Sequence, residues 1–241
     1  ATDEAFAFAR DLLEQLVAEP SVVGDEAAIG RCLDLVHDAL APLARSVARP
    51  VHDGLPSLIL RFGDGPPERL LTLAGHIDVV PAPGAWSSPP FALSRRGDGL
   101  VGRGVVDMKG GVAAAVAAIR LLAAEGRLAE CAVELVVTGD EEVGSARGIR
   151  ALLAAGEIAG RMAVCPEPTG LDVYLGNRGV AAYEIVVHGR GGHAGVLHAL
   201  HSPLGPALAL CRALESLPLP ARDDRFSPPT PSLAITRIDA G

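Results

Sequence analysis

Positive charge is scarce in this sequence, and lysine is almost absent. Twenty-one basic residues face 29 acidic ones, so the formal net charge is −8, and Lys109 is the single lysine beside twenty arginines. A chain this acidic lacks the electrostatic attraction that brings proteins to nucleic acids and to anionic membranes. We therefore expect no nucleic-acid partner and no membrane partner.

Long apolar runs are missing as well. The longest one covers residues 110–119 and ends at Arg120, well short of the roughly 20 residues that cross a bilayer. Residues 1–15 are acidic and amphipathic, without the basic and apolar regions of a signal peptide. A hydrophobic share of 49%, with no low-complexity block, excludes a disordered or fibrous chain. We expect a globular protein of the cytoplasm.

Closely spaced cysteine pairs are a third absence. The four cysteines are widely scattered and form no C-x-x-C motif: Cys32, Cys131, Cys165 and Cys211. This spacing argues against a disulfide framework and against a zinc knuckle. We interpret all four as reduced thiols, mostly buried, and Cys165 as a residue of a buried strand rather than a metal ligand.

What the sequence does contain is a regular alternation of helical and extended patterns. Apolar residues at helical spacing predict helices over residues 3–18, 25–40, 110–125 and 145–155, the last of them capped by Ser145. Apolar runs bounded by turn residues predict strands at 58–60, 70–73, 132–138, 161–165 and 172–175. Strands that alternate with helices are typical of an α/β fold, in which a mostly parallel sheet is flanked by helices.

The character of the chain changes after Gly179. Residues 181–187 and 233–238 are predicted strands, and a helix is predicted between them at about 203–217. This β-α-β order is the opening of a ferredoxin-like α+β layer, which would be incomplete at Gly241 and would leave an exposed sheet edge.

Four segments place acidic or imidazole groups just past an apolar strand. They contribute His76 with Asp78, then Asp107, the run Asp140–Glu142, and Glu167. Ligands collect at the carboxyl ends of strands in open α/β sheets, so these groups can converge in one crevice. The competing interpretation is that the acids only cap helices and solvate loops.

The residue types in these segments favour a metal site. His76 and Asp78 are two residues apart, so on extended chain they face the same way, and one can bind a metal while the other supports it. Glu141 and Glu142 are adjacent and can share the site only from a loop. One imidazole among several carboxylates suits Zn²⁺ first and then Co²⁺ or Mn²⁺, and the carboxylates suffice to bridge two ions about 3.5–4 Å apart.

Five motifs together resemble a known enzyme family. They are Gly-His-Ile-Asp-Val-Val-Pro at 75–81, Trp86 with Pro90-Phe91, residues 102–110 with Asp107-Met108-Lys109-Gly110, Asp140-Glu141-Glu142, and Glu167-Pro168-Thr169. In type, order and spacing they are similar to the dinuclear zinc deacylase and exopeptidase family. That family includes acetylornithine deacetylase, succinyl-diaminopimelate desuccinylase, aminoacylase and glutamate carboxypeptidase. The resemblance runs from about Leu12 to the last residue.

The resemblance implies a set of metal ligands. His76 and Glu167 would bind the first metal, and Glu142 would bind the second. Asp107 would bridge the two ions, and in this family the peptide bond after that residue tends to be cis. The expected cofactor is two Zn²⁺ ions per active site, with Co²⁺ or Mn²⁺ as the alternatives.

The same resemblance assigns the proton chemistry. Asp78 would orient the ring of His76, and Glu141 would be the general base that takes a proton from the metal-bridging water. A metal lowers the pKa of bound water towards about 7, and a positioned carboxylate adds roughly 10²–10⁴-fold by carrying the proton to the leaving amine. We therefore expect an enzyme, a zinc-dependent hydrolase of linear amides or peptides.

Two further residues gain a role only through the resemblance. His193 stands where the family has a histidine that reaches the active site of a second subunit and donates to the oxyanion, which implies a homodimer. Read from the residues alone, it is a solvated loop histidine, or part of a separate metal cluster with His188, His198 and His201. Arg178 would bind a carboxylate of the substrate or form a salt bridge at a hinge.

The expected activity is hydrolysis of the amide bond of an N-acyl amino acid, as in the acetylornithine deacetylase and desuccinylase branch. A dipeptidase or a glutamate-type carboxypeptidase is the alternative, because the metal site does not separate these small-molecule substrates.

The resemblance also divides the chain. Residues 1–177 would be the first segment of a catalytic, metal-binding domain, and residues 178–241 the first half of a lid or dimerisation domain. The family carries its last metal-ligating histidine in a later segment. We therefore expect a truncated chain with a weak or empty second metal site, which leaves a catalytically inactive fragment as a further alternative.

Overall fold

The chain forms two units in the computed structural model, which describes residues 2–190, 193 and 201–239. The units are Ala1–Asp172 and Val173–Gly241. The first unit holds the sheet, four of the five α-helices found among the described residues, and the acidic segments singled out above. The division falls close to the boundary predicted between residues 177 and 178.

A five-stranded mixed sheet lies at the centre of the first unit. Its strand order is β1 (Ser46–Ala48), β4 (Leu58–Phe62), β8 (Val133–Thr138), β5 (Leu71–His76) and β9 (Met162–Val164). β5 is parallel to both β8 and β9, whereas β1 pairs antiparallel with β4 and β4 pairs antiparallel with β8. The prediction of a largely parallel sheet therefore holds for β8, β5 and β9 but not for β1 and β4. The short connection between β1 and β4 suits an antiparallel pair, because parallel strands need a long crossover between them.

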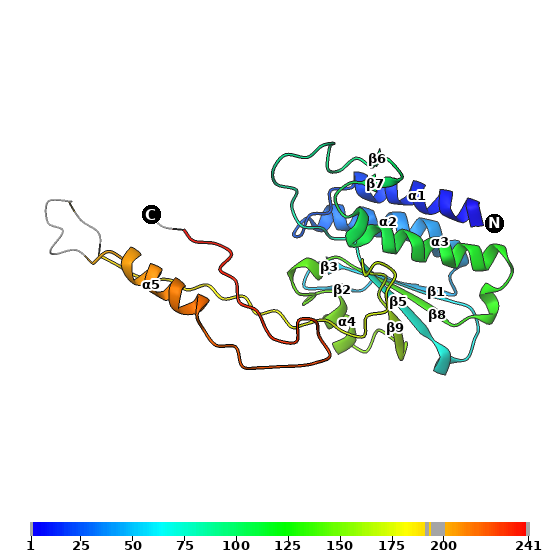
Figure 1. Cartoon of the computed structure of the whole chain (residues 1–241). Coiled ribbons are helices and arrows are strands. Elements are labelled where there is room, and N and C mark those ends of the chain that lie inside the picture. The colour runs from blue at the N-terminus through cyan, green and yellow to red at the C-terminus, as the bar shows by residue number, and fades with distance from the viewer. Residues whose placement is uncertain (1, 191–192, 194–200, 240–241) are drawn as a thin grey trace. The chain divides into compact units, whose positions relative to one another are not determined.

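Helices cover both faces of this sheet, which confirms the predicted α/β class. Figure 1 shows α1 (Thr2–Ala18), α2 (Glu26–Leu40) and α3 (Gly110–Ala124) on one face and the short α4 (Ile149–Ala154) on the other. The first three confirm the helices predicted from apolar spacing. Among the described residues, no helix has the length and apolar character that crossing a membrane requires.

The alternation of side chains along the strands explains the two layers. Leu60 of β4 and Leu135 of β8 belong to the main core beneath α1, α2 and α3. Their neighbours Ile59 and Val136 point the other way and pack with Leu152 of α4. Successive residues of a strand face opposite sides, so apolar residues at every position produce a sheet buried on both faces.

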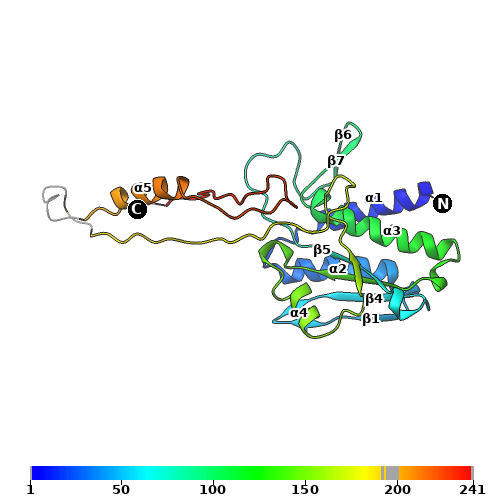
Figure 2. The ribbon, with the colours of Figure 1, turned by 60° about the horizontal axis from the view of Figure 1, so that its bottom comes forward.

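Two small hairpins lie outside the main sheet. They are β2 (Val51–His52) with β3 (Leu55–Pro56), and β6 (Ser94–Arg96) with β7 (Gly99–Val101). The second hairpin lies beside α1 (Figure 2), where the partly buried side chains of Leu93 and Leu100 pack against the main core.

Helix α4 begins later than predicted. Its N-cap is Gly148 rather than Ser145, which has a φ of +59° and lies outside the helix. The segment before α4 folds around Asp140, whose carbonyl accepts the N–H of Ser145 and whose Oδ2 accepts the N–H of Arg147 at 2.7 Å. A tight turn therefore replaces the first predicted helical turn.

The second unit differs most from prediction. Helix α5 (Leu204–Glu215) is present where a helix was predicted. Residues 172–175, 181–187 and 233–238, however, form no strands, and apolar side chains in them such as Tyr183 and Ile238 are exposed. A strand exists only when its backbone groups pair with a neighbouring strand, and the pairing within the described part of this unit is an isolated bridge between Arg190 and His201. The ferredoxin-like layer is not confirmed.

The four cysteines are free thiols. Cys32 is the buried one, in the core between α1 and α2, whereas Cys165 is exposed just beyond β9. The expectation of mostly buried thiols is wrong, because Cys131 and Cys211 are half-buried and Cys165 is exposed. Cys165 follows β9, an edge strand whose three residues are themselves exposed.

A buried carboxylate on the central strand joins its neighbours on the α4 face of the sheet. Glu134 of β8 is fully buried and accepts hydrogen bonds from Nε of Arg61 at 2.7 Å and from the Thr72 hydroxyl at 2.9 Å. The backbone N–H groups of Ala159 and Gly160 also donate to it. Glu134 thus joins β4, β5 and the connection to β9.

Replacing Arg61 with Met is expected to lower the free energy of unfolding by about 2–3 kcal/mol, because the buried Glu134 carboxyl then loses its positive partner. The figure is below that for a fully buried pair because the Arg61 side chain is 35% exposed. Arg45→Met is the matched control: its pair with Asp64 is exposed on both sides, so a loss of less than about 1 kcal/mol is expected. Urea unfolding followed by circular dichroism measures both variants, and equal midpoints would contradict this account.

Candidate metal centre

Three parallel strands end side by side, and the segments that follow them carry the predicted site. His76 is the last residue of β5 and is paired with Thr138 at the end of β8. Glu141 and Glu142 follow β8 in a short 3-10 turn, and Glu167 lies just beyond β9. The carboxyl ends of parallel strands meet at one edge of a sheet, where ligands bind in open α/β folds.

The imidazole of His76 is 1% exposed and has a contact at each ring nitrogen. Nδ1 lies 3.0 Å from the backbone carbonyl of Asp78 and 3.3 Å from its Oδ1. Nε2 lies 3.2 Å from Oδ1 of Asp107, 3.9 Å from Glu141 Oε2 and 3.8 Å from Glu167 Oε1. One nitrogen is therefore backed by the protein, and the other points into a group of carboxylates, as in metal-ligating histidines.

The carboxylate of Asp78 connects two of the strand ends. It is fully buried, and besides its contact with the His76 ring it accepts two backbone hydrogen bonds. The N–H of Glu141 donates to Oδ1 at 3.2 Å, and the N–H of Glu142 donates to Oδ2 at 3.1 Å. Sequence reasoning missed these two bonds, because no residue pattern marks a contact between a side chain and distant backbone groups.

Asp107 comes from the turn Val105–Lys109 that precedes α3. Its side chain is 55% exposed, and the peptide bond between Asp107 and Met108 is cis, as the resemblance implied. Glycines allow this turn to approach its neighbours closely. Gly104 has a φ of +79°, and a Cβ at Gly111 would lie 2.1 Å from the carbonyl oxygen of Pro166. The close approach at Gly111 brings the start of α3 against the residue before Glu167.

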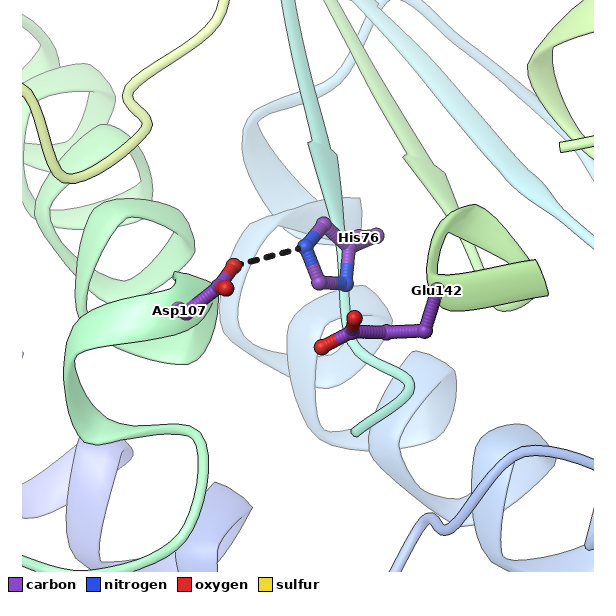
Figure 3. A group of neighbouring side chains, drawn as sticks. All are labelled: His76, Asp107 and Glu142. Carbon is purple, nitrogen blue, oxygen red and sulfur yellow. Dashed lines mark hydrogen bonds and ion pairs between the residues drawn. The ribbon is translucent and has the colours of Figure 1, made fainter. Parts of the chain in front are cut away.

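His76, Asp107 and Glu142 form the group of side chains best placed to hold a metal ion. Each offers one ligand atom, and these atoms all lie within 4.8 Å of one another. Figure 3 shows the three side chains converging from the end of β5, the turn before α3 and the turn after β8. Glu167 approaches the same imidazole nitrogen from beyond β9.

The charges of this group shift the pKa values of its members. Burial alone would lower the pKa of His76, but the hydrogen bond and the charge of Asp78, together with Glu167 and Glu141, raise it to about 9. Burial raises the pKa of Glu142 and of Glu167, and neighbouring acids, Asp107 among them, raise both further. Carboxylates crowded around one imidazole repel one another, and a bound dication relieves this repulsion.

Two of the predicted site residues lie in the second unit. His193 is exposed, whereas His198, which was considered with it as part of a histidine cluster, lies outside the described residues. The guanidinium of Arg178 donates to the carbonyl of Pro228 and lies over the ring of Phe226, 5.9 Å from its centre. The roles expected for His193 and Arg178 stay predictions.

A known protein family matches the part of the chain that carries this site. The family model for peptidase family M20/M25/M40 matches residues 72–222, a span that contains the strand ends and all the predicted site residues. The chain belongs to this peptidase family. The metal-dependent chemistry of this family is consistent with the imidazole and carboxylates gathered around His76.

Two curated relatives of this M20 chain carry the same name. The succinyl-diaminopimelate desuccinylase of Gluconacetobacter diazotrophicus is 35% identical, over 100% of this chain and 63% of that protein. That of Paracoccus denitrificans is also 35% identical, over 95% of this chain and 61% of that protein. The chain therefore spans less than two thirds of the length of these relatives.

Solved structures share the M20 fold. A metallo-carboxypeptidase from Sulfolobus solfataricus matches with a TM-score of 0.56 at 21% identity, over 66% of this chain and 37% of that one. A dipeptidase from Saccharomyces cerevisiae matches with a TM-score of 0.53 at 23% identity, over 60% and 34%. At these identities the likeness concerns the fold alone.

Replacing Asp78 with Asn is expected to weaken Zn²⁺ binding by about 10–100-fold. The amide turns one acceptor oxygen into a donor that faces another N–H, so the turn at Glu141–Glu142 and the ring of His76 lose their common support. Calorimetric titration of folded protein measures the affinity. Asp64→Asn is the control on the surface, and an Asp78→Asn protein that binds Zn²⁺ like the parent chain would refute the role of this carboxylate.

Zinc affinity is expected to rise with pH, by up to about tenfold per unit between pH 7 and 8.5. With a pKa of about 9, His76 is protonated at neutral pH, and a metal binds only the neutral ring, so binding must release that proton. Titration in buffers of different ionisation enthalpy counts the protons released, and about one from His76 is expected at pH 7. An affinity that stays constant across this range would contradict the combination of a raised pKa for His76 and metal binding through its neutral ring.

Proposed function

We propose that this chain is the catalytic, metal-binding part of an amidohydrolase that cleaves the amide bond of a small N-acyl amino acid, with N-succinyl-diaminopimelate as the preferred substrate class. The observation that carries the proposal is the convergence of one imidazole and several carboxylates at the ends of β5, β8 and β9. The name shared by relatives at 35% identity supports the acyl group.

The residues present fit a divalent metal of the zinc class. An imidazole nitrogen and two carboxylate oxygens lie within 4.8 Å of one another, and these are donors that Zn²⁺, Co²⁺ and Mn²⁺ accept. On this proposal His76, Asp107 and Glu167 would hold one ion, and Asp107 and Glu142 would hold the other. A bound ion would supply Lewis acidity, polarising the acyl carbonyl and making water more acidic.

Glu141 is the proposed general base. It lies outside the converging group of three ligands, yet its Oε2 is 3.9 Å from Nε2 of His76 and its side chain is half-exposed. Its backbone is held by Asp78, so the carboxylate starts from a defined place at the edge of the site. A carboxylate that is positioned but not used as a ligand can exchange protons with water and substrate.

The reaction then needs one proton acceptor and one proton donor, and Glu141 serves as both. Its carboxylate takes a proton from the attacking water as the oxygen bonds to the acyl carbon. The carbon–nitrogen bond breaks, and the proton on Glu141 passes to the leaving nitrogen. One water is consumed, and the remaining acid proton also ends on the amine, so a carboxylate and an ammonium ion are released and the base returns to its starting state.

The roles expected for the second unit belong to this proposal too. His193 would donate to the oxyanion in the active site of a second copy of the chain, which requires a homodimer. Arg178 would bind a carboxylate of the substrate by a bidentate hydrogen-bonded pair.

Replacing Glu141 with Gln is expected to lower kcat by about 10²–10⁴-fold while Zn²⁺ affinity stays near that of the parent chain, because the base is removed and the ligands are kept. The assay follows release of free amine from N-succinyl-diaminopimelate with added Zn²⁺ or Co²⁺. Glu130→Gln is the matched control, since this exposed glutamate lies before the other end of β8.

The substrate class is tested in the same assay with N-acetylornithine and a dipeptide. Fastest release from the succinyl substrate supports the proposal, and fastest release from the dipeptide favours the dipeptidase alternative. Equal rates in Glu141→Gln and the parent chain, or no hydrolysis of any substrate by metal-loaded protein, would overturn it.

A further inference from the structure

Lys109 is the one lysine or arginine side chain that is buried among the described residues. It follows the Asp107–Met108 peptide and has no exposed surface. Its Nζ donates to the backbone carbonyls of Leu16 at 2.7 Å and Glu19 at 2.8 Å. A charge in the interior is costly unless it is fully hydrogen-bonded, so these two bonds are required for the side chain to occupy this position.

The two carbonyls belong to the end of α1, which finishes at Ala18. The last carbonyls of a helix have no partner within it, and they carry the negative end of its dipole. Helix α1 has no basic residue in its own last turn. The positive charge at its end is instead supplied by Lys109, about 90 residues further along the chain.

The same side chain lies against the turn that carries Asp107. The N–H of Lys109 donates to the carbonyl of Gly104 at 2.9 Å, closing the turn. A Cβ at Gly104 would lie 3.2 Å from Cδ of Lys109, so the turn folds directly over the aliphatic part of the lysine. Met108 is 1% exposed, whereas Asp107 extends toward the group around His76. The side chain of Asp107 is therefore exposed, while the next two residues of the same turn, Met108 and Lys109, are buried.

We propose that Lys109 is a positioning residue of the metal centre: its buried ammonium group ties the turn that carries Asp107 to the end of α1 and thereby fixes the Asp107 carboxylate beside His76. This inference rests on the proposed function, because the place of Asp107 matters through the ion it binds. It also gives a reason for the single lysine. A compact ammonium group reaches two carbonyls in an enclosed position, where the larger planar guanidinium used at the other twenty basic positions is less suited.

The test replaces Lys109 with Met, which keeps the aliphatic chain and removes the charge and the donor. Metal affinity is measured by calorimetry with Zn²⁺, and ligand geometry by the visible absorption of Co²⁺-saturated protein. We expect affinity to fall by about 10–100-fold and the Co²⁺ spectrum to change. A purely structural role would lower stability and leave the spectrum of the folded, saturated protein as it was.

Arg120→Met is the matched control. Nη1 of Arg120 in α3 donates to the carbonyl of Ala39 near the end of α2 at 2.8 Å, a contact of the same kind away from the metal centre. This variant should keep the affinity and spectrum of the parent chain. Parental affinity and spectrum in Lys109→Met would overturn the inference while leaving the proposed function intact. A parent chain that binds neither Zn²⁺ nor Co²⁺ would overturn both.

A second measurement needs no variant, which matters if Lys109→Met does not fold. Because the chain has one lysine, lysine labelled with ¹⁵N gives a single ammonium resonance. A buried, hydrogen-bonded ammonium should be protected from exchange with water, and its resonance should move when Zn²⁺ is added. A resonance lost to rapid exchange, or one that Zn²⁺ leaves unmoved, would contradict the proposed coupling.

Discussion

The site depends on one buried carboxylate. Asp78 lies just past β5, and its two oxygens hold the turn that follows β8 while one of them also supports the ring of His76. A carboxylate removed from water must be fully hydrogen-bonded, and the partners available here are the backbone of Glu141 and Glu142 and the imidazole. Satisfying Asp78 therefore sets the mutual position of His76, Glu141 and Glu142, which are the proposed first ligand, base and second ligand. The side chain that does this is itself not exposed to substrate.

Charge is arranged in two layers around this point. In the layer nearer to solvent, Asp107, Glu141 and Glu167 surround Nε2 of His76. Partial burial and the neighbouring acids raise the pKa of Glu167. Behind, the Lys109 ammonium joins the turn of Asp107 to the end of α1. The acids proposed to bind metal lie at the ends of the strands, whereas Asp78 and Lys109, which hold their turns, are buried. The contacts that build the core of the unit therefore also position the candidate site.

Prediction from the sequence succeeded where the pattern was local and the element could bury its apolar face against a neighbouring element. Helices α1, α2 and α3 and strands β5 and β8 lie where apolar spacing placed them, because each buries an apolar face against the others. It failed at Ser145, where hydrogen bonds to Asp140 replaced the first turn of a helix. It failed again at residues 181–187 and 233–238, where β-type residues have no strand to pair with in the part of the chain that the structure describes. A segment forms the helix or strand that its residues favour only when tertiary contacts supply the packing or hydrogen-bond partners that this element needs.

By itself, the sequence determined the fold class, the order of the motifs and the identity of the side chains that could bind a metal, since these follow from residue type and spacing. It could not determine which of them touch. The 4.8 Å grouping of His76, Asp107 and Glu142, the hydrogen bonds of Asp78 to backbone N–H groups, and the anchoring of Lys109 on α1 join segments tens of residues apart. Such contacts were decided by the tertiary structure, because each arises from burying polar groups that must then find partners, and those partners come from whichever strand ends the packed sheet and helices bring together.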